Sequence, residues 1–266
     1  MIVPLVATIY YSLFRYNIQR PDTFEFWGAK NYYYFLTDPA FITSLLNTFI
    51  LVGGVIAISI VGGILLGILM NKEFYGRGIA RLMVIGPFFV MPSVAALIWK
   101  HMFMNSESGL FAIFAKLLGA EPIQFLTNYP LASIVVIVAW QWLAFATLIL
   151  LTALQSLDQE QMEAAEMDGA SALARFRYLT VPHLARPITI IILIETIFLL
   201  AIFAEIFVTT AGGPGNASTN LPWIIYKVGR QSFDAGGAAA GGIIAVIVAN
   251  IFAIVLVKII GKNLDG

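Results

Sequence analysis

Residues 158–187 form a polar, charged stretch between two long apolar runs. Hydrocarbon provides no water to hydrogen-bond such side chains, so the stretch cannot lie inside a bilayer. Each flanking run, 131–154 and 188–208, is long enough to cross one, since a spanning helix needs about 20 apolar residues. We therefore predict that 158–187 is a loop at a membrane surface between two spanning helices.

The composition also predicts an integral membrane protein. The chain is 60% hydrophobic and 11% charged, whereas soluble domains contain about 25% charged residues. Its formal net charge is zero, which gives no case for nucleic-acid binding. It has no cysteine, which excludes disulfides, thiolate catalysis and zinc fingers.

Six apolar runs predict an all-α fold with about six transmembrane helices. The runs are 1–16, 43–70, 82–104, 131–154, 188–208 and 237–260. The first is short and begins abruptly, so we expect a first helix that lacks its start in this sequence. The polar stretches between the runs are too short for a separate soluble domain, so residues 1–266 are predicted to form a single membrane domain.

The polar stretch carries the signals of two helices with a sharp bend between them. Asp158 can cap the first helix, which the helix former Ala164 continues. Gly169 is a typical helix stop. Ser171 can then cap a second short helix ending near Pro182. We predict a rigid knob; the alternative is an amphipathic connector on the lipid surface, which the acidic start of the stretch disfavours on an anionic bilayer.

The same stretch resembles the EAA loop of ABC-importer permeases. The resemblance rests on Glu163-Ala164-Ala165, on Gly169 and on residues 179–182, Leu-Thr-Val-Pro, where Ile and Leu are more usual at the positions of Leu179 and Val181. It implies a type I ABC importer permease fold in which 156–187 is a cytoplasmic coupling loop. The residues expected to couple the chain to an ATPase are Glu163, Ala164, Ala165, Asp168, Gly169 and Pro182.

The resemblance also implies partners and a location. The expected partners are a second homologous permease subunit, two ATPase subunits and an extracytoplasmic solute-binding protein, all at the bacterial inner membrane, which this chain crosses several times. The chain has no GxxxxGK[ST] phosphate-binding loop, so ATP and Mg²⁺ are expected on the partner ATPases and no cofactor is expected here. No nucleophile–base–orienter set is visible, so the chain is not expected to be an enzyme.

Orientation follows from the resemblance, because Lys and Arg are nearly balanced between the two sides. Both chain ends and the loop after residue 71 are then cytoplasmic. On the outer side, residues 27–34 are dense in aromatic rings and contain the family's Gly-x-x-Asn-Tyr pattern. They are either an interfacial aromatic belt or part of a docking surface. Residues 110–118 are apolar but too short to span, so we expect them to lie along the outer surface.

Glycine and proline mark further special positions. Gly212-Gly213-Pro214 predicts a tight, irregular turn, and it resembles a turn in the branch of the larger maltose permease subunit. Gly63 and Gly67 form a small-xxx-small pair suited either to packing within the chain or to a subunit interface. Pro87 and Pro92 should break the third run.

Two places carry polar chemistry inside the apolar runs. Glu195 is a candidate site, because an ionisable residue within a span costs at least about 2.5 kcal/mol; the alternative is pairing with a basic residue of a partner subunit. Glu205 is expected to pair with Lys100 near the outer end. Gln141 and Phe145 share a helix face beside Trp142, which suits the hydroxyls and C–H faces of a sugar, or else reflects interfacial Trp anchoring.

The resemblance extends this set of cargo residues. Without gaps, six residues fall where the maltose permease contacts its sugar: Gln141, Trp142, Phe145, Glu195, Leu199 and Ile202. Leu199 and Ile202 replace amides there, so the implied cargo is a sugar or polyol other than maltose. Among such permeases, the chain most resembles those of the sorbitol/mannitol type. The alternative is a secondary transporter or channel acting alone, with Glu195 as an ion or proton site.

Overall fold

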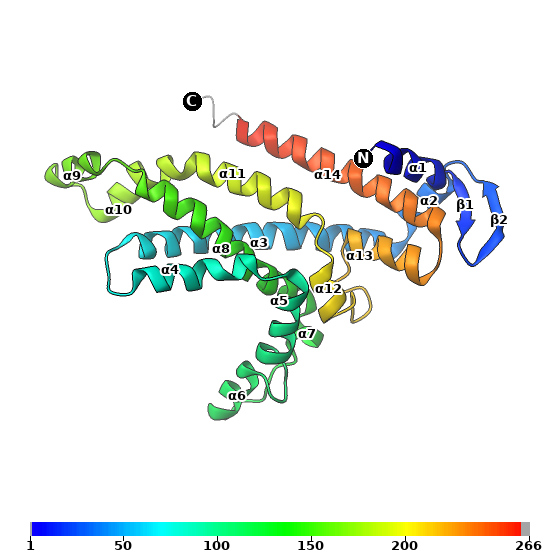
Figure 1. Ribbon diagram of the computed structural model, residues 1–266, viewed down its shortest axis with the longest axis horizontal. Helices are drawn as coiled ribbons and strands as arrows, with labels where there is room; N and C mark the ends of the chain where they lie inside the picture. Colours follow the sequence, from blue (N-terminus) through cyan, green and yellow to red (C-terminus); the bar gives the residue numbers. More distant parts are fainter. Residues whose placement is uncertain (1, 262–266) are drawn as a thin grey trace. The chain divides into compact units, whose positions relative to one another are not determined.

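The computed structural model describes residues 2–261, and the side chains of all of these except Gln159 and residues 256–261. Apart from one short hairpin, all regular secondary structure in its described part is helical, which confirms the predicted fold class (Figure 1). The helices and strands are α1 Ile2–Ser12, β1 Phe14–Asn17, β2 Arg20–Phe26, α2 Lys30–Thr37, α3 Pro39–Asn71, α4 Arg77–Ile85, η1 Gly86–Phe89, α5 Pro92–Ile98, η2 Trp99–Phe103, α6 Leu110–Leu117, α7 Phe125–Asn128, α8 Pro130–Gln155, α9 Gln159–Met167, α10 Ala172–Arg175, η3 Phe176–Thr180, α11 Val181–Leu199, α12 Ala204–Thr209, α13 Leu221–Tyr226, η4 Lys227–Gln231 and α14 Ala235–Gly261.

Four described helices are long and apolar enough to cross a membrane: Pro39–Asn71, Pro130–Gln155, Ala172–Leu199 and Ala235–Val255. A fifth span exists if Arg77–Phe89 and Pro92–Phe103 are counted as one broken helix. The break at Val90–Met91 lies between the two prolines that predicted it. The remaining run contains α1, which has 11 residues and is shorter than a span. The count of about six is therefore approximate.

The fifth run differs from its prediction at both ends. A single helix was expected over 188–208, but α11 ends at Leu199 and α12 starts again at Ala204. The carbonyl of Ile202, freed by this break, accepts a hydrogen bond from Asn220 Nδ2 at 2.6 Å. At the other end, no helix stops near Pro182: α10, the π-helical turn η3 and α11 follow without a gap. The π-helical turn, with its wider hydrogen-bond spacing, accommodates the proline ring.

The described chain divides into two compact units. One consists of Met1–Gly53, Pro92–Ile137 and Ile197–Val255, and the other of Gly54–Met91, Val138–Thr196 and Leu256–Gly266. The core of the first unit is Phe35, Phe41, Leu221, Ile224 and Ile244. It also holds the β1–β2 hairpin, which the sequence analysis missed and which pairs Phe14 with Phe26.

The second unit packs α3 tightly against α8. Its core contains Leu150, Leu154 and Leu184. A Cβ atom on Gly63 would lie 3.1 Å from the Cβ of Ala146, and one on Gly67 would lie 3.2 Å from Leu154 Cδ1. The small-xxx-small pair therefore serves packing within the chain, the first of the two interpretations left open.

We expect Gly63→Leu to destabilise the protein, because the added side chain has to displace Ala146 and Leu150 of α8. Overpacking of this kind costs about 1–3 kcal/mol, or roughly 2–10 °C in thermal midpoint. The measurement is thermal unfolding of the purified protein in detergent. Gly53→Leu in the same helix is the control, since a Cβ there meets nothing within 4 Å. Equal midpoints for both variants would contradict the packing assignment.

Candidate functional site

The most unusual buried group of the second unit is the carboxylate of Glu195, in α11. Its side chain is 0% exposed. Ser59 of α3 donates to Oε2 over 2.6 Å. Oε1 and the hydroxyl of the adjacent Thr196 have no hydrogen-bond partner among the described residues. An acceptor buried without a donor costs about 1–3 kcal/mol or more, so this carboxylate is suited to receive a donor from a molecule that enters.

Ser59 is a site residue that sequence reasoning missed. It is one of the two serines of the apolar helix α3 and lies 136 residues from Glu195, and no local pattern connects it to that residue. A hydroxyl inside a long apolar helix was the only available signal, and hydroxyls in such helices commonly bond their own backbone. Ser59 Oγ also lies 3.1 Å from the carbonyl of Ile56.

A second polar group lies at the break in the third run. Gln141 of α8 is buried, and its Nε2 donates to the carbonyl of Val90 over 2.6 Å. This amide satisfies a carbonyl that the broken helix leaves unpaired. Gln141, which the sequence predicts to contact the sugar, thus also has a structural role.

Three aromatic rings stand around this break. Phe145 stacks on Phe88 with ring centroids 5.2 Å apart, and Trp142 meets Phe145 edge-on at 5.5 Å. Phe88 was not among the candidate residues, yet the structure adds it to the pair from α8. The cluster offers the half-buried rings of Trp142 and Phe145 and the exposed ring of Phe88 next to a buried amide.

The other two candidate residues, Leu199 and Ile202, belong to the first unit. Both are buried, at 0% and 8% exposure. Leu199 is the last residue of α11 and Ile202 lies in the break that follows. Their side chains contribute apolar surface only, as their residue types predicted.

The pair expected between Glu205 and Lys100 is a wrong prediction. Glu205 is buried in α12, and Lys100 Nζ instead donates to the carbonyl of Val208 over 2.8 Å. Val208 is in the last turn of α12, where carbonyls lack partners within the helix. Lys100 therefore caps the C-terminal end of α12 instead of pairing with Glu205.

The turn at residues 211–219 is tight and irregular, as its glycines and proline predicted, and a side chain of α3 holds it. Ala211 and Gly212 have positive φ values of 49° and 79°. Asn47 of α3 donates from Nδ2 to the carbonyls of Asn216, Ala217 and Thr219 at 3.1, 3.2 and 2.9 Å. A Cβ atom on Gly212 would collide with the ring of Trp223, so this turn requires glycine.

The knob, residues 158–182, follows α8 and leads into α11, with α9 and α10 at its tip (Figure 1). Asp158 Oδ1 accepts the backbone N–H of Glu160 over 2.9 Å, and Ser171 Oγ accepts that of Ala174 over 3.3 Å. Gly169 ends α9 with a φ of 78°. These three local predictions are confirmed.

The knob is stiffened internally and exposes an apolar surface. Arg175 forms an ion pair with Glu166, and just outside the knob His183 Nε2 lies 2.9 Å from the carbonyl of Ala153. Met167 and Leu173 are 88% and 74% exposed. An exposed apolar surface on a rigid support is typical of a protein contact. The candidate residues Glu163, Ala164, Asp168, Gly169 and Pro182 are exposed, and Ala165 is half-buried.

Comparison with known proteins finds one family and several relatives. Residues 59–266 match the family described as binding-protein-dependent transport system inner membrane component. The chain is 38% identical to a probable ABC transporter permease protein, y4oQ, of Sinorhizobium fredii, over 90% of this chain and 77% of that protein. It is 30% identical to the trehalose/maltose transport system permease protein MalF of Thermococcus litoralis, over 97% and 88%.

A solved structure shares the fold. It is a bacterial alginate ABC transporter in complex with an alginate pentasaccharide-bound periplasmic protein, with a TM-score of 0.79 and 21% identity, covering 96% of this chain and 86% of that one.

Proposed function

Because this chain belongs to the family of binding-protein-dependent transport system inner membrane components, we propose that it forms the membrane pathway for a sugar or polyol. It is a multi-pass inner-membrane subunit of an ABC importer, and it works with a binding protein. Its relatives are permease subunits, so it is a transport component rather than an enzyme. In this proposal a second, homologous permease subunit and two ATPases complete the importer, and ATP and Mg²⁺ bind to those ATPases.

The buried carboxylate of Glu195, with one oxygen lacking a donor, is the observation that carries the proposal for the cargo. A sugar or polyol hydroxyl can donate to Oε1 while Ser59 holds Oε2. The rings of Trp142 and Phe145 suit the C–H faces of a sugar. Gln141, Leu199 and Ile202 complete the proposed contact set.

The names of the relatives agree with this class of cargo. One relative is a trehalose/maltose permease, and another, 30% identical over 92% of this chain and 79% of its own length, is the arabinooligosaccharide transport permease AraP of Halalkalibacterium halodurans. Leu199 and Ile202 cannot hydrogen-bond, so we propose fewer polar contacts than in a maltose site and a cargo other than maltose.

The proposed coupling site is the knob. Glu163, Ala164, Ala165, Asp168, Gly169 and Pro182 would seat against a partner ATPase, where small residues permit close approach. A knob transmits movement only if it does not deform, and the caps and the Arg175–Glu166 ion pair supply that stiffness. The alternative, a transporter or channel acting alone, is not favoured, because the relatives are ABC permeases.

The test of this function has two parts. The matching extracytoplasmic binding protein is screened by thermal shift against sugars and polyols. The purified importer is then assayed in liposomes for ATP-dependent uptake of the compound that stabilises the binding protein. We expect one or a few sugars or polyols to pass both steps. Uptake by this chain alone, without ATP, would overturn the proposal.

A further inference from the structure

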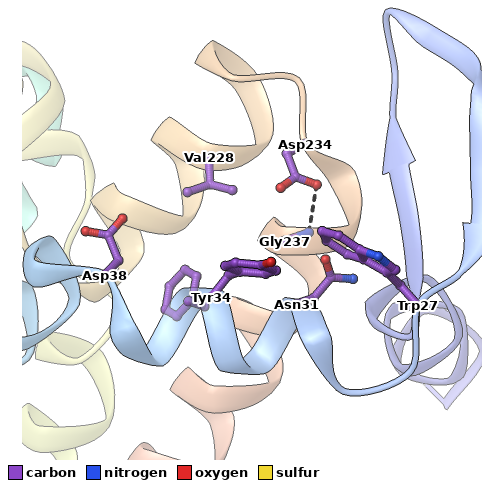
Figure 2. Close-up of a pocket in the computed structure, with 8 residues that line it drawn as sticks. Trp27, Asn31, Tyr34, Asp38, Val228, Asp234 and Gly237 are labelled. Atoms are coloured by element: carbon purple, nitrogen blue, oxygen red, sulfur yellow. Dashed lines mark hydrogen bonds between the residues drawn. The ribbon is translucent and has the colours of Figure 1, made fainter.

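The first unit contains an open pocket of about 240 Å³ that none of the candidate residues touches. It lies among α2, the turn before α14 and the start of α14. Figure 2 shows the ring of Tyr34 between two carboxylates, with Asp38 on one side and Asp234 on the other. The lining residues are Trp27, Asn31, Tyr34, Phe35, Asp38, Val228, Asp234 and Gly237.

The buried amide of Asn31 leaves an acceptor in this pocket. Asn31 is 3% exposed, and its Nδ2 donates to the carbonyls of Ser12 and Phe14, each over 2.8 Å. These two bonds fix which end of the amide is the oxygen. Oδ1 has no partner among the described residues, and Figure 2 shows it turned toward the side of Asp234 and Gly237. Because Asn31 lines the open pocket, this oxygen can accept a hydrogen bond from a ligand that enters it.

Both carboxylates keep acceptor capacity although each caps a helix. Asp38 Oδ1 accepts the N–H of Ala40 over 2.8 Å, and Asp234 Oδ1 accepts that of Gly237 over 2.9 Å. The second oxygen of each remains available. Glycine at position 237 allows the carboxylate of Asp234 to lie here, since a Cβ atom on residue 237 would collide with that carboxylate.

The rings at the edge of the pocket already attract cations. Trp27 and Tyr34 stack with centroids 5.4 Å apart. The guanidinium of Arg15 and the ammonium of Lys30 lie 5.2 and 5.8 Å from the ring centroid of Trp27. Among the eight described lining residues two are acidic and none is basic. An aromatic floor flanked by carboxylates is suited to an ammonium or guanidinium group.

The pocket lies beside the start of α3. Asn71, at the end of α3, lines one cavity with Met162 and Ala172 of the knob. Asp38 precedes the start of α3, and a helix of 33 residues is about 50 Å long, well beyond the hydrocarbon thickness of about 30 Å. A helix of this length spans the membrane, and the loop after Asn71 is cytoplasmic in the proposed function, so the chain at Asp38 enters α3 from the outer side, from which a binding protein approaches.

We propose that this pocket receives an arginine or lysine side chain of the binding protein and so anchors it on this subunit. The inference rests on the proposed function, because only an importer of this class has such a partner. The charge complementarity determines the kind of occupant: acceptors, two carboxylates and an aromatic face suit a donor-rich cation better than a neutral sugar, which also requires donors.

The test removes the charges of the two carboxylates and keeps their hydrogen bonds to the helix N-termini. Asp38→Asn/Asp234→Asn retains an oxygen for each helix N-terminus but removes both charges. Affinity of the binding protein for the complete importer in nanodiscs should fall about tenfold or more at low salt and lose most of its salt dependence. Asp22→Asn/Glu121→Gln is the control, since it removes two charges from exposed positions outside the pocket and should change the affinity less than about twofold.

Two results would overturn the proposal. One is a binding-protein affinity in the pocket variant equal to that of the control. The other is binding of free agmatine, a small guanidinium probe, that the pocket variant abolishes while the binding-protein affinity stays unchanged, which would make a free cation the occupant. Wild-type importer that takes up no sugar or polyol would fail the uptake assay instead, so the two proposals fail separately.

Discussion

Gly169→Pro should abolish uptake while leaving the subunit able to assemble at least in part. Gly169 has a φ of 78°, and proline is fixed near −65°, so α9 cannot turn into α10 as it does now. A local distortion of about 3 kcal/mol corresponds to roughly a hundredfold loss if the knob must keep its shape to transmit force. The measurement is ATP-dependent uptake in liposomes, together with co-purification of the ATPase.

The matched control is Gly119→Pro. Gly119 also follows a helix, has a φ of 73° and donates its N–H three residues back, to Lys116, as Gly169 does to Glu166. It lies outside the knob, so uptake should be retained. Glu163→Lys is a second variant, which keeps the helix and reverses an exposed charge, and it should also stop uptake. Normal uptake in both knob variants would exclude the coupling role.

Glu195→Gln should reduce uptake by about 10- to 100-fold while sparing basal ATP hydrolysis. The variant keeps an oxygen for Ser59 but replaces the carboxyl group with an amide, whose NH2 group cannot accept a hydrogen bond from the cargo. Leaving a buried polar group without its partner costs about 1–3 kcal/mol, which sets this range. The measurements are uptake at several cargo concentrations and ATPase activity without cargo.

Glu205→Gln is the control for Glu195→Gln, because Glu205 is equally buried, at 2% exposure, and is not a proposed contact. It should alter thermal stability more than uptake. Ser59→Ala should also reduce uptake, but less than Glu195→Gln does, since it removes the hydrogen-bond donor of Glu195 and leaves the carboxyl group itself. Unchanged uptake in Glu195→Gln would reduce that residue to a structural role.

Local signals allowed the knob to be predicted in detail. Asp158, Gly169 and Ser171 each act on backbone groups within three residues, so their effects can be read from neighbouring positions alone. The prediction that a helix ends near Pro182 was wrong because it depends on more than the neighbouring residue types. Whether a proline ends a helix depends on the hydrogen-bond spacing before it, and the π-helical turn at 176–180 is not encoded in any pattern we recognise.

Long-range contacts account for what the sequence did not predict. The hairpin at 14–26 depends on pairing between strands and on the stacking of Phe14 on Phe24. Ser59, Asn220 and Asn47 act on groups far away in the chain, and a single polar residue in an apolar run does not reveal its partner. Lys100 likewise bonds a carbonyl 108 residues away, at Val208, which its own neighbours do not reveal.

The hydrogen bond from Gln141 to the carbonyl of Val90 connects α8 to the break in the third span. Without this bond, the peptide group at Val90 could rotate independently of α8, and a displacement of α8 would not reach it. With the amide in place, a shift of α8 along its axis pulls that peptide with it, and the reverse also holds. Gln141 thus couples the movement of α8 to that of the helix break at Val90.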